Sequence, residues 1–227
     1  TRYPSAVVFK NIEDNFLSPS YAGIMQHSKW RERIRKVHSH FEDGTLEMQS
    51  ANSSDALLMN VFCYPGMQKW SGLCNLLRIE PTAEIEFGWN PSFENEKKNH
   101  PTEIDMKIGD RIFESKLTEQ SFTTKQKDIV EQYADFHKVF DAEALDNGRS
   151  EYSHYQLIRN ILTAYKYDCS FSILIDETRI DLMKELFIVV QAIKDQEIRN
   201  RISFFTWQEI SAVCGAELKE YLHRKYL

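Results

Sequence analysis

The sequence has no closely spaced pair of cysteines, no long apolar run and no excess of positive charge. A zinc or iron–sulfur site normally shows at least one close cysteine pair, so the cysteines are expected to be small, buried and reduced, as in a cytoplasmic protein. The longest apolar run, LFIVV at 186–190, is far shorter than the roughly 20 residues of a membrane span. The four cysteines concerned are Cys63, Cys74, Cys169 and Cys214.

A linker rich in proline, glycine or serine is also missing. The 227 residues are 42% hydrophobic, which is enough to bury a proper core. One compact domain is therefore the simplest interpretation of the chain.

The net charge of −6 argues against a protein that coats nucleic acid through bulk charge. An enzyme that meets a polyanion through one local basic face remains possible on this charge. Five basic residues crowd the segment 29–36, where they form either a solvated polar face or a set of phosphate contacts. They are Lys29, Arg31, Arg33, Arg35 and Lys36.

Hydrophobic periodicity predicts helices, then a meander of three strands, then helices that alternate with two further strands. This order indicates a mixed α/β domain whose helices cover a central sheet. The predicted helices are 20–41, 55–62, 123–140, 152–165, 179–201 and 208–226, and the predicted strands are 83–89, 103–108, 111–117, 169–175 and 202–207.

The stretch PTEIDMKIGDRIFESKLTE, residues 101–119, places many charges in a predicted hairpin. Gly109-Asp110 suits a tight turn, so that Ile108 faces Arg111. Counting outward puts Asp105 opposite Glu114 and Glu103 opposite Lys116, with Cβ atoms roughly 5 Å apart. Alternation puts the apolar side chains on the other face of the hairpin, namely Ile104, Met106, Phe113 and Leu117.

Two opposed carboxylates repel each other unless a cation lies between them. A hard divalent ion such as Mg²⁺ uses one or two carboxylates together with water and phosphate oxygens. The register of Asp105 and Glu114 therefore predicts a metal at this end of the hairpin, with Lys116 close by.

Asp105 followed by Glu114-Ser115-Lys116 resembles the D…(D/E)-x-K motif of the PD-(D/E)xK nuclease superfamily, although Ile104 replaces the preceding proline. The strings ESKLTE and YQLIRN resemble a restriction-endonuclease subfamily known mainly from sequence. The resemblance implies a restriction-endonuclease-like αβββαβ core over 83–175 within a single domain, 1–227. Residues 1–80 would then form a helical elaboration and residues 176–227 a helix–strand–helix.

The resemblance also implies roles for individual residues. Asp105 and Glu114 would bind the metal next to Ser115, and Lys116 would orient or deprotonate the attacking water. An upstream acid would join them, for which Glu86 is preferred to Glu84. On the following helix, Gln156 and Arg159 match a glutamine motif of the exonuclease branch, and their i, i+3 spacing lets both face the site.

The sequence thus predicts a nuclease that uses Mg²⁺ or Mn²⁺ to hydrolyse phosphodiester bonds, with DNA as the expected partner and no membrane. A catalytically silent nucleic-acid-binding or scaffold module of the same fold is the first alternative. A glycosidase with paired carboxylates is the weaker one. For the nuclease we also expect a locally positive cleft rim, to which Arg159 or the 29–36 segment would contribute.

Overall fold

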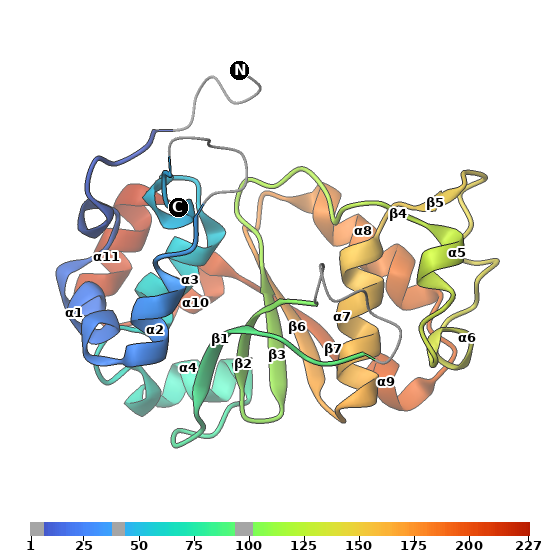
Figure 1. The fold of residues 1–227 in the computed structure, drawn as a ribbon. Coiled ribbons are helices and arrows are strands. Elements are labelled where there is room, and N and C mark those ends of the chain that lie inside the picture. The colour runs from blue at the N-terminus through green and yellow to red at the C-terminus, as the bar shows by residue number, and fades with distance from the viewer. Residues whose placement is uncertain (1–6, 38–43, 94–101) are drawn as a thin grey trace.

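A five-stranded mixed sheet runs through the centre of the protein, seen here in a computed structural model (Figure 1). The structure describes residues 7–37, 44–93 and 102–227. Neighbouring strands from β1 to β3 are antiparallel, and β6 and β7 join as parallel strands. Their order across the sheet is β1 (Ile85–Trp89), β2 (Ile104–Ile108), β3 (Arg111–Ser115), β6 (Ser170–Ile175) and β7 (Ile202–Thr206).

Helices cover both faces of this sheet (Figure 1). One group comes from the two ends of the chain: α1 (Ser18–Gln26), α2 (Ser28–Arg33), α3 (Ser54–Phe62), α4 (Ser71–Leu77), α10 (Trp207–Ala212) and α11 (Ala216–Lys225). The opposite group is α5 (Lys127–Val130), α6 (Phe136–Val139), α7 (Tyr155–Lys166), α8 (Ile180–Gln191) and α9 (Gln196–Asn200). The predicted class, a mixed α/β fold whose helices cover a central sheet, is confirmed.

Short elements complete the chain. A small second sheet pairs β4 (Lys125–Gln126) with β5 (Glu151–Tyr152). Three single turns of 3₁₀ helix are η1 (Ile12–Asn15), η2 (Glu47–Gln49) and η3 (Met67–Lys69).

The hairpin of β2 and β3 has the predicted register. Ile108 pairs with Arg111 around the Gly109-Asp110 turn, and Gly109 has the positive φ of 57° that such a turn demands. The next pairs are Lys107 with Ile112 and Met106 with Phe113. One further step outward brings Asp105 level with Glu114.

The predicted sharing of one face by all the apolar hairpin residues is wrong at Ile104. Met106 and Phe113 pack against α3 and α4, whereas Ile104 packs in the cluster on the α7 side. Gly88, between two paired residues of β1, has a φ of 63°. This left-handed residue interrupts the regular alternation next to Asp105, so Ile104 turns to the other face.

Tertiary pairing shortens the predicted helix at 123–140. Lys125 and Gln126 form β4 instead, paired with Tyr152 and Glu151, and the helices α5 and α6 are single turns. Thr123 has a positive φ of 57°, which is incompatible with a helix start. Tyr152 correspondingly belongs to a strand, and α7 begins only at Tyr155.

Three other long helices are each divided into two. The extended residue His27 separates α1 from α2, and residues 38–41 of that prediction lie outside the described residues. Asp195 starts α9 after α8 by accepting a hydrogen bond from the Ile198 amide. Gly215, which lies against the ring of Trp70, separates α10 from α11.

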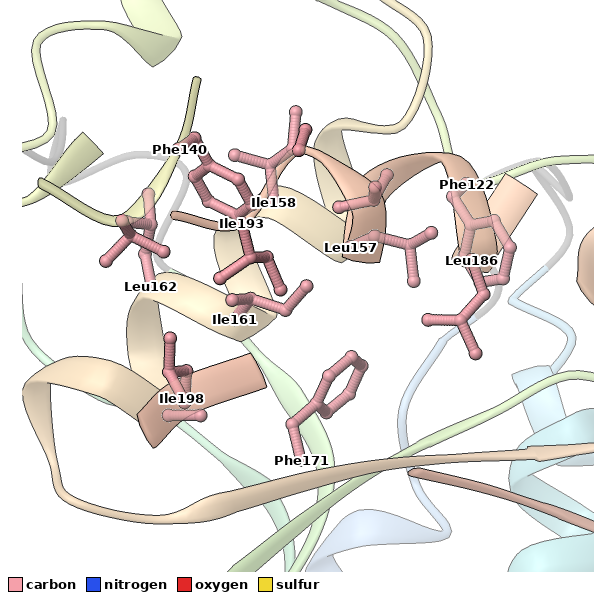
Figure 2. Close-up of a cluster of buried hydrophobic side chains, with 14 of the residues drawn as sticks. Phe122, Phe140, Leu157, Ile158, Ile161, Leu162, Phe171, Leu186, Ile193 and Ile198 are labelled. Carbon is pink, nitrogen blue, oxygen red and sulfur yellow. The ribbon is translucent and has the colours of Figure 1, made fainter. Parts of the chain in front are cut away.

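Helix α7 is the element that connects the core to the site. Its apolar side is buried against Phe171 of β6 and Leu186 of α8, as Figure 2 shows. That side is formed by Leu157, Ile158, Ile161 and Leu162. Because one stripe of the helix is fixed in this way, the side chains of its polar stripe are held in defined positions.

The cysteine prediction agrees with the structure at three positions. All four cysteines are free, and Cys63, Cys74 and Cys169 are buried, while Cys214 is partly exposed. Among the helices of the described segments, none is both long and apolar enough to cross a bilayer.

Candidate active site

A polar cavity of about 260 Å³ opens where β2, β3, α3 and α7 meet. It contains all three residues of the predicted motif, together with the predicted helical pair Gln156 and Arg159. The lining residues are Lys36, Glu47, Ser54, Asp55, Glu103, Asp105, Glu114, Ser115, Lys116, Glu119, Gln156 and Arg159.

Glu114 lies deepest, with 1% of its surface exposed. Asn160 Nδ2 donates a hydrogen bond to Glu114 Oε2 over 2.8 Å, and Gln156 Nε2 donates to Oε1. Lys116 Nζ lies 2.8 Å from the same Oε1. Two amides of α7 and one ammonium therefore fix the orientation of this buried carboxylate.

Lys116 is held as firmly as its partner. Its ammonium donates to Gln156 Oε1 over 2.8 Å, and its carbonyl accepts a hydrogen bond from Trp207 Nε1. Burial alone would lower the pKa of Lys116, but the nearby carboxylates, Glu114 first among them, raise it above the ordinary lysine value. Lys116 is therefore a cation at neutral pH rather than a ready base.

The negative charge of Asp105 is stabilised by fewer neighbouring groups than that of Glu114. Its Oδ2 accepts a hydrogen bond from the Ser115 amide over 2.8 Å. Burial raises the pKa of Asp105 well above its ordinary value, and the charges of Glu114 and Asp55 raise it further, against the smaller effect of Lys116. The site thus contains a carboxylate whose negative charge is unfavourable until a cation approaches.

Asp55 is a site residue that the sequence analysis missed. It lies in the first turn of α3, which Ser53 caps, and its side chain is 8% exposed. Arg33 Nη2 pairs with Asp55 Oδ2 at 2.7 Å. Burial raises the pKa of Asp55 although Arg33 acts in the opposite direction. The only local signal was an acid just after a helix cap, which many helices have for stability alone.

Arg33 also connects the cavity floor to its rim. Its Nη1 lies 2.9 Å from Glu103 Oε1, and Lys36 Nζ lies 2.8 Å from the same oxygen. Burial would raise the pKa of Glu103, but Arg33 and Lys36 hold it below its ordinary value. Glu103 therefore pairs with these two cations and not with Lys116, which the predicted register puts opposite it.

The loop after β3 closes another side of the cavity. Glu119 accepts hydrogen bonds from the Ser54 hydroxyl at 2.6 Å and from the Leu117 amide at 2.7 Å. The Ser115 hydroxyl donates to the carbonyl of Ser54 over 3.2 Å. These bonds join the motif strand to the start of α3 and so place Asp55 beside Asp105.

Neither Glu86 nor Glu84 reaches the cavity, so the structure does not bring together the predicted upstream acid and the motif. Glu86 pairs with Lys107, its neighbour in the sheet, at 3.8 Å. Glu84 pairs with Lys29 at 3.4 Å on the exposed surface. The register puts Gly88, which has no side chain, level with Asp105, and this is why β1 contributes no carboxylate there.

The rim was expected to be locally positive, but the described residues that line the cavity are not mostly basic. Six acidic and three basic side chains line the cavity within the described residues. Arg159 and Lys36 are among the bases, as expected, and Arg159 Nη2 donates to the carbonyl of Glu103 over 3.1 Å. The walls are mixed, with acid in excess.

The residues fit a hard divalent cation. No group of three or more His, Cys, Asp and Glu side chains in the described parts of the chain is already arranged as a metal site. Asp105 and Glu114 nevertheless supply the one or two carboxylates that Mg²⁺ uses beside water and phosphate oxygens. Burial, and then the charges of Glu114 and Asp55, raise the pKa of Asp105, and a bound cation would act against that rise.

Comparison with known proteins gives one match. No curated protein and no solved structure matches the chain. The model of the family described as Restriction Endonuclease associating with ARP (REase-ARP) matches residues 3–227. Since this match covers nearly the whole chain, the protein belongs to the REase-ARP family of restriction endonucleases.

Proposed function

We propose that the protein is a metal-dependent nuclease that hydrolyses phosphodiester bonds of DNA, and that residues 1–227 form a single domain built around this site. The observation that carries the proposal is the meeting of Asp105, Glu114 and Lys116 in one cavity. A surface ladder of charges would not require a buried carboxylate, Glu114, beside a half-buried one, Asp105, and a buried ammonium, Lys116.

Asp105 and Glu114 would hold Mg²⁺ or Mn²⁺, next to Ser115. When bound, the ion would polarise the scissile phosphate and lower the pKa of a coordinated water. Asp55 takes the place proposed for Glu86 as the third acid, because it is buried and lines the same cavity, and because its charge, after that of Glu114, raises the pKa of Asp105.

Lys116 would act as a fixed positive charge. Held against Glu114 and Gln156, its ammonium would stabilise the negative charge that develops on the phosphate and orient the water. Gln156 and Asn160 would keep Glu114 and Lys116 in place, since they donate to the carboxylate and Gln156 accepts from the ammonium.

The test is a cleavage assay on labelled single-stranded DNA, double-stranded DNA and RNA, each with Mg²⁺, with Mn²⁺ and with a chelator. We expect DNA to be cut only with metal, and Lys116→Met to be inactive. The alternative, a catalytically silent binding module of the same fold, is favoured by the acid-rich walls of the cavity. It predicts metal-independent binding and no cutting by the parent protein under any of these conditions.

A further inference from the structure

The side chain of Glu103 is held by basic residues at the rim of the cavity. Its Oε1 accepts hydrogen bonds from Arg33 Nη1, at 2.9 Å, and from Lys36 Nζ, at 2.8 Å. Arg159 approaches the same residue from α7 through the Glu103 carbonyl. The Glu103 carboxylate thus pairs with two cations, and a third, Arg159, binds the backbone carbonyl of the same residue.

The fold fixes the position of Arg33. The Arg33 side chain is 8% exposed, and its guanidinium lies on the backbone of β1 at Gly88. A Cβ at Gly88 would be 2.6 Å from Arg33 Nη1 and 3.1 Å from Cζ. Glycine at position 88 leaves room for Arg33 to lie against β1 and reach Asp55 and Glu103.

Arg33 also has hydrogen-bonding capacity left. Its Nε is buried and has no partner in the described part of the chain. A guanidinium presents a planar fork of donors that matches phosphate as well as carboxylate geometry. A phosphate in place of the Glu103 carboxylate would keep the contact with Nη1 and would offer a second oxygen to Lys36 Nζ, which binds the same Glu103 oxygen now.

Glu103 is the replaceable member of the cluster. Its side chain is 34% exposed and that of Lys36 is 38% exposed, whereas Arg33 and Asp55 are both 8% exposed. Glu103 and Asp105 are two residues apart in extended chain and so roughly 7 Å apart. That is the scale of the separation between neighbouring phosphates along one nucleic-acid strand.

We propose that Arg33 and Lys36 form a subsite for a backbone phosphate of the nucleic acid next to the bond that is cut, and that Glu103 fills this subsite in the free protein. The proposal rests on the nuclease function proposed above for its substrate class. Binding exchanges one anion for another: the phosphate enters, the Glu103 carboxylate turns out to solvent, and Arg33 keeps its ion pair with Asp55.

The experiment measures binding of a fluorescein-labelled DNA duplex by anisotropy, in chelator, over a series of salt concentrations. Lys36→Gln should weaken binding several-fold and reduce the slope of log K against log salt by about 0.9, the value for one lost phosphate contact. Glu103→Gln should tighten binding several-fold, because the competing anion is gone. In the double variant most of the gain from Glu103→Gln should disappear.

Lys29→Gln is the matched control. Lys29 lies on α2, the helix that carries Arg33, and has one ion pair, with Glu84, but it is 66% exposed and does not line the cavity. Its removal changes the net charge as Lys36→Gln does, and should leave affinity and salt slope near those of the parent. All variants are exposed enough to fold, which a thermal melt would verify.

Equal effects of Lys36→Gln and Lys29→Gln, or unchanged affinity of Glu103→Gln, would overturn the subsite. Cleavage by the parent protein is scored separately. A parent that cuts DNA while Glu103→Gln binds no tighter would keep the nuclease function and lose the subsite. A parent that never cuts but shows the expected binding pattern would lose the nuclease function and keep the subsite.

Discussion

Asn160 of α7 donates a hydrogen bond to Glu114 of β3, two residues that are 46 positions apart in the sequence and are both buried. The bond joins helix α7 to the motif strand. Asn160 binds Oε2 of Glu114, whereas Lys116 binds the other carboxylate oxygen, Oε1. Glu114 is thereby held at both oxygens before any ligand arrives, which is the preorganisation that catalysis by fixed charges requires.

Asn160→Ala should therefore destabilise the protein by roughly 1–3 kcal/mol, because it removes one partner of a buried carboxylate. As a positioning residue, Asn160 should affect the chemical step more than substrate affinity: kcat should fall while KM stays near the parent value. Chemical denaturation and steady-state kinetics measure the two effects. Asn52→Ala, at an exposed site, is the control. An unchanged kcat would show that Asn160 only supports the fold.

Lys116→Met should lose cleavage but keep metal binding. Without its cation, Glu114 is a buried and unpaired carboxylate, and breaking such a pair costs about 3–5 kcal/mol. A divalent ion should return much of this loss, so the rise in melting temperature on adding Mn²⁺ should exceed that of the parent. Thermal melts with and without Mn²⁺ measure it. A smaller rise than in the parent would mean that Lys116 assists the ion rather than competing with it.

Asp105→Asn should change how stability depends on pH. The folded-state pKa of Asp105 is raised by burial, by Glu114 and by Asp55, so its contribution to stability is present below the unfolded-state value and is lost as pH rises through the folded-state value. In chelator, Asp105→Asn should accordingly be more stable than the parent near pH 8 and similar to it near about pH 4. Melting temperatures over this range, with Asp110→Asn at the exposed turn as control, are the measurement. A larger stability advantage of Asp105→Asn near pH 4 than near pH 8 would contradict the predicted pH dependence.

Gly88→Ala should displace Arg33 and weaken the site. The new methyl group would clash with the guanidinium, in addition to the strain of a positive φ, which costs on the order of 1–3 kcal/mol. Gly66→Ala separates the two effects, because Gly66 has a φ of 77° and open space around its Cβ position. We expect Gly88→Ala to lose clearly more stability than Gly66→Ala in chemical denaturation. Equal losses would mean that Arg33 moves away without cost.

The hairpin and its charged end could be predicted from the sequence because both depend on residues that are close together in the chain. Alternation fixes which residues can face each other, and the Gly109-Asp110 turn fixes the register, so the meeting of Asp105 with the motif strand follows from local rules. Gln156 could be placed for the same reason, since it lies in the first turn of a strongly amphipathic helix whose buried side is evident from the sequence.

Asp55 and Arg33 could not be found in this way. Their roles depend on the packing of α2 and α3 against the sheet, which brings residues from before position 60 next to residues beyond position 100. Glu86 was chosen wrongly for a related reason, because the register puts Gly88, not Glu86, level with Asp105. The long connection between β1 and β2 does not fix their register, so the sequence alone could not predict this pairing. The broken helices likewise reflect pairing with distant segments, as at Lys125 and Gln126.

The most direct test of the account is whether Asp105 and Glu114 hold a divalent metal. Thermal melts of the parent, Asp105→Asn and Glu114→Gln in rising Mg²⁺ and Mn²⁺, each paired with a DNA cleavage assay, would decide it. Metal should raise the melting temperature of the parent by mass action and switch on cleavage, and both substitutions should abolish the rise and the cleavage together. A Glu114→Gln variant that responds to metal like the parent would show that Glu114 is not a ligand and that the proposed chemistry is wrong.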